Sequence, residues 1–73
     1  MRHMLRVLNH TGDTELKFDP TDAAEVNAAA EKFRELIGQR HLAFALKDGQ
    51  PIQVHTFDPA AEETILSPAL VGG

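Results

Sequence analysis

The sequence predicts an α+β fold in which a single helix packs across one face of a mixed sheet. One segment near the middle of the chain has the periodicity of an amphipathic helix. Short segments in which apolar and polar residues alternate, as in half-buried strands, precede and follow it. A chain of 73 residues allows only one hydrophobic core. The lone helix must therefore bury its apolar stripe against the sheet.

The helix is expected at residues 20–37. Apolar residues recur there with i, i+3, i+4, i+7 spacing, and the stripe comprises Ala23, Val26, Ala29, Ala30, Phe33, Leu36 and Ile37. Asp19 is predicted as the N-cap, Pro20 as the first helical residue, and Asp22 as a carboxylate near the positive end of the helix dipole. Gly38 fits the left-handed position that follows a last turn.

Two strands are expected before the helix, over residues 3–9 and 14–18. The His-Thr-Gly-Asp segment between them is typical of a turn, which makes the strands a hairpin with a four-residue loop at 10–13. The predicted register, which places the large apolar groups of both strands on one face, pairs Val7 with Leu16 and Leu5 with Phe18.

A second hairpin is expected after the helix, because Leu42, Phe44 and Leu46 alternate with smaller or polar residues. The Asp-Gly pair at 48–49 is typical of a two-residue turn. That turn would make the large apolar residues of the two strands face opposite ways. A three-residue loop, 48–50, is therefore predicted. Its register pairs Leu46 with Ile52 and Phe44 with Val54.

The rest of the chain is predicted to hold one short turn and a last strand. Residues 58–63 repeat the acid-then-proline opening of the helix, but the apolar stripe soon ends, which indicates one turn of 3₁₀ type. Residues 64–67 form the last strand, and Pro68, which lacks an N–H, ends its regular pairing. The predicted organisation is one domain over 1–67 with a flexible tail at 68–73.

The predicted order of strand, strand, helix, strand, strand, turn and strand is that of the β-grasp fold, whose last strand lies between the first and the third. Residues 7–14, 18–22 and 41–47 resemble the first turn, the helix entry and the third strand of the ubiquitin-like family. The chain also ends in Gly72-Gly73, as members of that family do. The resemblance spans nearly the whole chain and implies a ubiquitin-like β-grasp.

The chain departs from the family at the positions that ubiquitin receptors read. In the family, receptors read an apolar patch made by a leucine in the first turn, an isoleucine on the third strand and a valine near the tail. The resemblance puts His10 at the position of the leucine and Ala43 at that of the isoleucine. Leu70 and Val71 stand where arginines precede the diglycine. We therefore expect a prokaryotic relative that ordinary ubiquitin receptors do not recognise.

The resemblance implies covalent chemistry at the diglycine. Gly73 would be activated by an ATP-dependent adenylating enzyme, and Gly72 would be the slender residue behind it, because an unbranched end threads a narrow channel. Two products stay open: an isopeptide bond to a lysine, as made by a modifier, and a thiocarboxylate, as carried by a sulfur carrier. A third possibility is a non-conjugated adaptor, for instance in a phage or mobile-element assembly.

Composition excludes several other functions. The chain has no cysteine, so thiol nucleophiles and disulfides are excluded. A net charge of −4 and a pI near 5.4 argue against nucleic-acid binding. No apolar run approaches the roughly 18 residues that span a bilayer, and no export signal is present. A cytoplasmic protein with no membrane partner is expected. No phosphate-loop, dinucleotide or nucleophile-elbow motif occurs, so an enzyme is not expected.

No cofactor or metal is expected either. None of His3, His10, His41 and His55 has the helical spacing of a zinc pair. His3 and His41 would approach one another if the first and third strands flank the last. The acidic residues near 19–22 and 58–63 lie at predicted helix starts, where capping explains them without catalysis.

A protein partner is expected on the sheet face that points away from the helix. That face is predicted to be shallow and lined by His41, Ala43, Ala45, Gln53 and His55, which suits a partner's surface more than a small molecule. Leu70 and Val71 add a short apolar stretch of the kind that marks partner contacts. The predicted partner-binding residues are His41, Ala43, His55, Leu70 and Val71.

Overall fold

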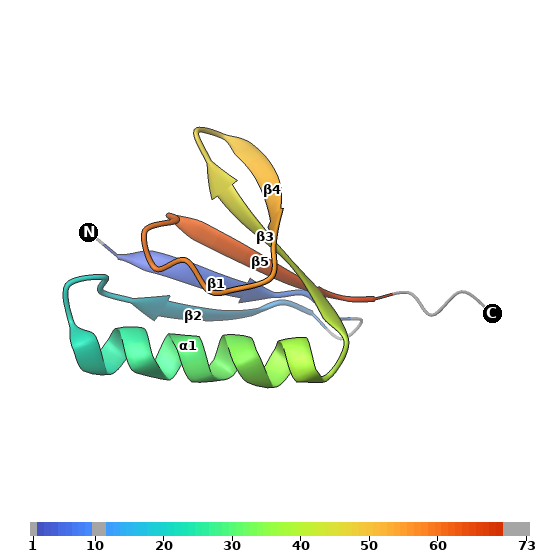
Figure 1. Ribbon diagram of the computed structural model, residues 1–73, viewed down its shortest axis with the longest axis horizontal. Coiled ribbons are helices and arrows are strands. Elements are labelled where there is room, and N and C mark those ends of the chain that lie inside the picture. Colours follow the sequence, from blue (N-terminus) through green and yellow to red (C-terminus); the bar gives the residue numbers. More distant parts are fainter. Residues whose placement is uncertain (1, 10–11, 70–73) are drawn as a thin grey trace.

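The computed structural model describes residues 2–9 and 12–69, which form one helix and a five-stranded mixed sheet (Figure 1). The elements are β1 (His3–Val7), β2 (Thr14–Phe18), α1 (Ala23–Gly38), β3 (His41–Lys47), β4 (Gln50–Val54) and β5 (Glu63–Pro68). The predicted α+β class is confirmed. Within the described ranges no helix has the length and hydrophobicity to cross a membrane.

The strand order in the sheet is β2-β1-β5-β3-β4, so the last strand lies between the first and the third, as predicted. β1 and β5 are parallel, and the other neighbours are antiparallel. Figure 1 shows α1 beside β2, with the β3–β4 hairpin twisting away from the helix at the opposite side of the sheet. We call the face that α1 covers the inner face and the opposite one the outer face.

The core lies between α1 and the inner face. Its buried members are Leu5, Val7, Phe18, Ala29, Phe33, Leu36, Ala43 and Leu66. Phe57, which follows β4, packs against this cluster with its ring 5.5 Å from that of Phe18 and 5.6 Å from that of Phe33. These tilted ring pairs have the centroid spacing that aromatic side chains prefer. The connection from β4 to β5 is thereby fixed to the helix side of the molecule.

The helix begins three residues later than predicted. Asp22 is the N-cap: its Oδ1 accepts hydrogen bonds from the N–H groups of Ala24 at 3.0 Å and Glu25 at 3.3 Å. Asp19 instead forms a side-chain turn, accepting from the N–H of Thr21 at 2.9 Å and from its hydroxyl at 2.7 Å. Glu25 then accepts the N–H of Asp19. Both aspartates have the chemistry of a cap, but the Asp19 carboxylate bonds within its own turn and the Asp22 carboxylate bonds to the first helical N–H groups.

The helix end also differs from the prediction. Gly38 is the last helical residue and has no positive φ. The left-handed residue is Arg40, with φ of 62°, and its N–H donates to Ile37 O at 3.2 Å. Gln39 N–H donates to Leu36 O at 3.0 Å, so the last turn tightens before the chain reverses into β3.

The first hairpin has the predicted face but not the predicted register. Leu5 pairs with Leu16 and Val7 pairs with Thr14, two residues away from the predicted pairing. The loop is therefore six residues long, from 8 to 13. Side chains alternate with a period of two, so a two-residue shift leaves the apolar side chains on the same face.

The second hairpin has a two-residue turn at 48–49 and not the predicted three-residue loop. Asp48 and Gly49 have φ of 52° and 78°, as in the type I′ turn that Asp-Gly favours. Ala45 pairs with Ile52 and Ala43 with Val54. The register is therefore shifted by one residue from the predicted one. The alanines of β3, and not its large apolar residues, share a face with Ile52 and Val54, and this face points inward. The large apolar residues of β3 point outward.

The segment before β5 is a turn and not the predicted 3₁₀ helix. Asp58 Oδ1 accepts the N–H of Ala60 at 2.9 Å, and Asp58 O accepts the N–H of Ala61 at 3.2 Å. β5 then begins one residue earlier than predicted, and its pairing with β3 ends at Pro68, as predicted. Ala69 N–H still donates to Arg40 O at 2.9 Å. The division between domain and tail stays a prediction.

Candidate interaction face

The outer face has an apolar half on β3 and β5. Leu42, Phe44 and Leu46 of β3 point outward, and Phe44 lies opposite Ile65 of β5. Leu42 is 41% exposed, although it is a large hydrophobic residue. The other three are partly buried. Ser67 lies opposite Leu42 and completes this half with a small polar group.

The other half of the outer face, on β1 and β2, is charged. Arg6 lies between three carboxylates: Asp13 at 3.9 Å, Glu15 at 3.4 Å and Glu63 at 3.6 Å. Within the described residues its buried Nε makes no hydrogen bond, because the facing Glu63 oxygen is slightly too distant. Each such partly exposed pair contributes about 0–1 kcal/mol. The cluster therefore orders the side chains more than it stabilises the sheet.

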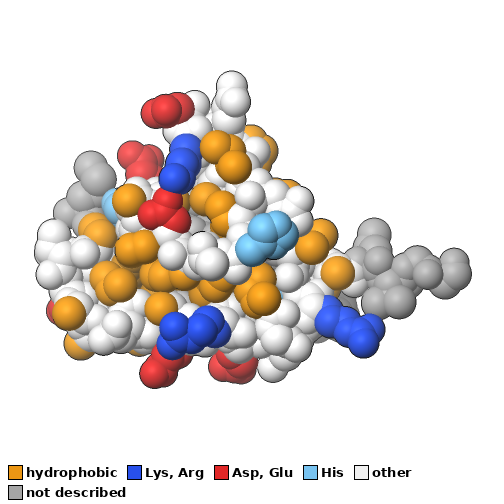
Figure 2. Space-filling view, viewed as in Figure 1, with side chains coloured by type: hydrophobic (Ala, Val, Ile, Leu, Met, Phe, Trp, Pro, Cys, Tyr) orange, Lys and Arg blue, Asp and Glu red, His pale blue; other side chains and the backbone are white. Residues whose placement is uncertain are grey.

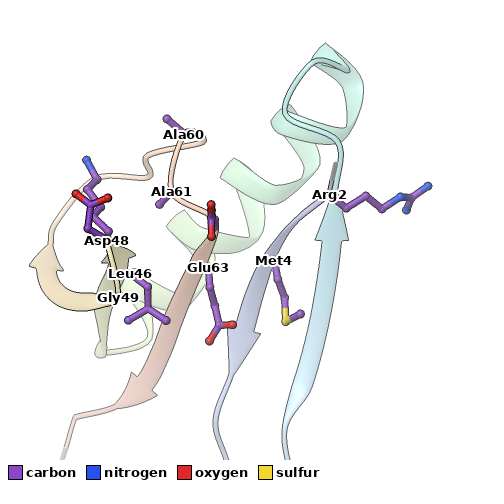
Figure 3. Close-up of a pocket in the computed structure, with 10 residues that line it drawn as sticks. Arg2, Met4, Leu46, Asp48, Gly49, Ala60, Ala61 and Glu63 are labelled. Atoms are coloured by element: carbon purple, nitrogen blue, oxygen red, sulfur yellow. The ribbon is translucent and has the colours of Figure 1, made fainter.

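An open hollow of about 670 Å³ lies at one end of the outer face. Figure 3 shows Leu46, Glu63 and Met4, from three neighbouring strands, pointing to the same side of the sheet beside it. The turn residues Asp48 and Gly49 border it as well. The lining mixes both charges with apolar groups and holds no nucleophile paired with a base, so the hollow resembles the rim of a contact surface.

A salt bridge holds the turn before β5 against the second hairpin. Lys47 Nζ lies 2.6 Å from Asp58 Oδ2. This contact with Lys47, together with the hydrogen bond from the N–H of Ala60, lowers the pKa of Asp58 below its usual value. The pKa of Asp19 is lowered in a similar way, by the backbone and hydroxyl hydrogen bonds from Thr21. The Asp19 shift thus comes from its own turn, and the Asp58 shift comes mainly from the salt bridge.

A second hollow, of about 580 Å³, lies on the helix side of the molecule. It is bordered by Phe33 and Ile37 of α1 and by His55 and Phe57 of the following connection. Figure 2 shows hydrophobic side chains gathered above the helix in this view. Phe33 is 1% exposed and belongs to the core, so this hollow directly borders the core.

The predicted partner-binding residues do not share one surface. Ala43 is 1% exposed and belongs to the core beside α1, and Ala45, two residues further along β3, is fully buried on the same inner face. Placing both on the face away from the helix was therefore wrong. His41 is half-buried at the inner face, with Nδ1 3.1 Å from Leu36 O. His55 is exposed, but it borders the hollow beside the helix. Only Gln53, which pairs with Phe44, lies on the predicted face.

The remaining predicted site residues, Leu70, Val71, Gly72 and Gly73, lie outside the described residues, as does His10. The residues that sequence reasoning missed are Leu42, Phe44, Leu46 and Ile65. The Asp-Gly turn was the available signal, because accepting it separates Leu42, Phe44 and Leu46 from the face that Ile52 and Val54 share with the alanines of β3.

His3 and His41 are not neighbours. β1 runs parallel to β5 with Met4 beside Glu63, whereas His41 pairs with Pro68 at the other end of that strand. Six residues along a strand separate their levels by about 20 Å. His3 Nδ1 lies 2.9 Å from Pro59 O, which accounts for its burial. Among the described residues, no three histidine or acidic side chains form a group able to hold a metal ion.

The geometry of the outer face therefore offers an apolar surface with a charged border. Apolar side chains at the centre and charged ones at the border are the arrangement of protein–protein contact surfaces. Comparisons with known protein families, with curated proteins and with solved structures find no match to this chain.

Proposed function

We propose that this protein is a small ubiquitin-like β-grasp module that binds another protein through the outer face of its sheet. The strand order β2-β1-β5-β3-β4 with one helix on one face supports the β-grasp assignment. The resemblance of three chain segments to ubiquitin-like proteins supports it independently. In this role the protein supplies a surface and a partner supplies any chemistry.

The observation that carries the proposal is the apolar half of the outer face. A strand in a small domain gains stability by turning its large apolar residues to the core, about 25 cal/mol for each Å² removed from water. β3 does the opposite with Leu42, Phe44 and Leu46. Leu42 is exposed and the other two are partly exposed. Adjacent apolar groups that remain accessible to water mark contact surfaces.

The shape of the surface favours a protein partner over a small molecule. Small-molecule sites are concave, mostly apolar and enclose most of their ligand. The outer face is a sheet surface, and the hollow at its end is lined by charged and apolar groups together. Arg6 and its carboxylates border the apolar half, where the charged groups of a partner would be paired at low desolvation cost.

Site-specific photo-crosslinking in the native cells tests this role. A photo-reactive phenylalanine analogue in place of Phe44 should form a defined adduct with one partner. The same analogue in place of Arg34, an exposed residue of α1, should not form it. Phe44→Ser should then weaken binding of the purified partner at least about tenfold, as truncation of a central contact residue does. No adduct at position 44, or the same adduct from position 34, would contradict the proposal.

The covalent roles are further proposals that rest on Gly72 and Gly73 alone. A sulfur carrier isolated from its native cells would have the mass expected when one carboxylate oxygen is replaced by sulfur. A modifier would give covalent ladders on denaturing gels, and deletion of Gly73 would abolish them. An unmodified protein that binds its partner equally well without both glycines excludes both covalent roles and leaves the adaptor.

A further inference from the structure

β2 is an edge strand, and some of its backbone N–H and C=O groups point away from β1 to the open edge of the sheet. Met4 N–H donates to Glu62 O at 3.0 Å, so on β1 the even-numbered residues bond to β5. Backbone groups alternate along a strand, and the odd-numbered residues of β1 therefore bond to β2. Their partners on β2 bond back to β1. The N–H and C=O groups of Glu15 and Lys17 consequently point to the open edge.

The opposite edge of the sheet, on β4, is protected. The two-residue turn makes Lys47 and Gln50 the hydrogen-bonded pair that closes the hairpin. Because backbone groups alternate along a strand, those of Pro51 and Gln53 point to the open edge. Proline has no N–H to donate there. Proline on an edge strand blocks the addition of a further strand. β2 has no proline and presents two donors where β4 presents one.

The side chains of β2 make this open edge self-complementary. In an antiparallel pair of two β2 strands centred on Leu16, Glu15 lies opposite Lys17 of the second copy, and Lys17 lies opposite its Glu15. Both pairs are of the hydrogen-bonded kind, so each exchanges two backbone bonds. Opposite charges directly across a pair of strands are stabilising. Thr14, Glu15 and Lys17 are all exposed, which leaves the edge open to approach.

We propose that the β2 edge pairs with the β2 edge of a second copy of this chain, giving a symmetric dimer with a continuous ten-stranded sheet. The same patch serves both copies, as an isologous two-fold contact requires. The contact is one strand wide, so the dimer forms weakly and depends on concentration. The two outer faces lie on the same side of the joined sheet. This inference does not depend on the outer face having a partner.

A charge-swap experiment with the whole chain tests the pairing. Glu15→Lys gives an edge with two lysines, and Lys17→Glu gives an edge with two glutamates, so each variant alone places like charges opposite. Each should self-associate at least about tenfold more weakly than the wild type, measured by sedimentation. Mixed in equal amounts, the two variants should form a heterodimer, seen by native mass spectrometry. A wild type that stays monomeric at millimolar concentration, or a mixture without heterodimer, would overturn the proposal.

A backbone experiment separates this edge from the other. Lys17→Pro removes an outward N–H on β2, and Gln53→Pro removes the matching N–H on β4. The first should abolish the dimer, and the second should leave it intact. Amide hydrogen exchange gives the same contrast without a substitution: exchange at Glu15 and Lys17 should slow as concentration rises, and exchange at Gln53 should not. Equal behaviour of the two edges would contradict the assignment of the dimer to β2.

Discussion

β3 buries its small residues on one face and leaves its large apolar residues partly exposed on the other, whereas hydrophobicity alone would predict the reverse. The inward positions hold Ala43 and Ala45, which are almost fully buried, whereas the outward positions hold large apolar residues that stay partly exposed. The inner face lies under α1, whose Phe33 and Leu36 already fill the core. A large residue on the helix needs a small one on the facing strand, because the interior is close-packed. Burial on β3 was thus decided by the element above it.

Truncation of core and outer-face leucines should show the largest difference between the faces. Leu66 on the inner face is fully buried, and Leu66→Ala should lower the free energy of unfolding by about 2–5 kcal/mol. Leu42 on the outer face is 41% exposed, and Leu42→Ala should lower it by less than about 1 kcal/mol. Urea unfolding of both variants measures the difference. Equal losses would mean that Leu42 also belongs to the core.

Replacing a small residue by a large one should also destabilise the inner face more than the outer face. Ala45 is fully buried on the inner face, so Ala45→Leu should overfill its surroundings and lower the free energy of unfolding by about 1–3 kcal/mol. Ser67 lies on the outer face opposite Leu42, and Ser67→Leu should change it by about 0.5 kcal/mol or less. Thermal unfolding provides the comparison. If Ala45→Leu is neutral and Ser67→Leu is destabilising, the inward phase assigned to β3 is wrong.

The smallest expected effect concerns the salt bridge that joins the second hairpin to the turn before β5. Contact with Lys47 lowers the pKa of Asp58 in the folded protein, so this stabilisation is present above the unfolded pKa, near 4. It is lost as pH falls further, through the lowered folded pKa. The fall in unfolding free energy between pH 5 and pH 2 should therefore be smaller in Lys47→Met than in the wild type.

Both side chains of this pair are partly exposed, so water weakens the interaction and the difference should be small. A carbon-detected titration of Asp58 gives the more direct reading, because its midpoint should rise in Lys47→Met. An unchanged midpoint would assign the shift to the N–H of Ala60 alone.

Local patterns were enough to predict the helix and the strands, since each depends on residues close in sequence. The strand order joins distant segments, and it was predicted from the β-grasp fold, which has this order of elements. The stripe that ends at Leu36 and Ile37 identified the helix, and Pro68 marked the end of the last strand. Asp19 and Asp22 both fit an N-cap by residue type, and the side-chain turn that Asp19 forms with Thr21 leaves the cap to Asp22. The register of the first hairpin could not be chosen from the apolar pattern, because pairings two residues apart put the same side chains on the same face.

The candidate site could not be placed from the sequence, because its position depends on one turn. The sequence by itself determined that β3 has a large apolar set and a small set on opposite faces, and that Asp48-Gly49 follows it. Only the tertiary structure decided which set faces the helix. Phe33 and Phe57 already fill the space above the sheet, so the alanines lie inward and Leu42, Phe44 and Leu46 form the outer surface.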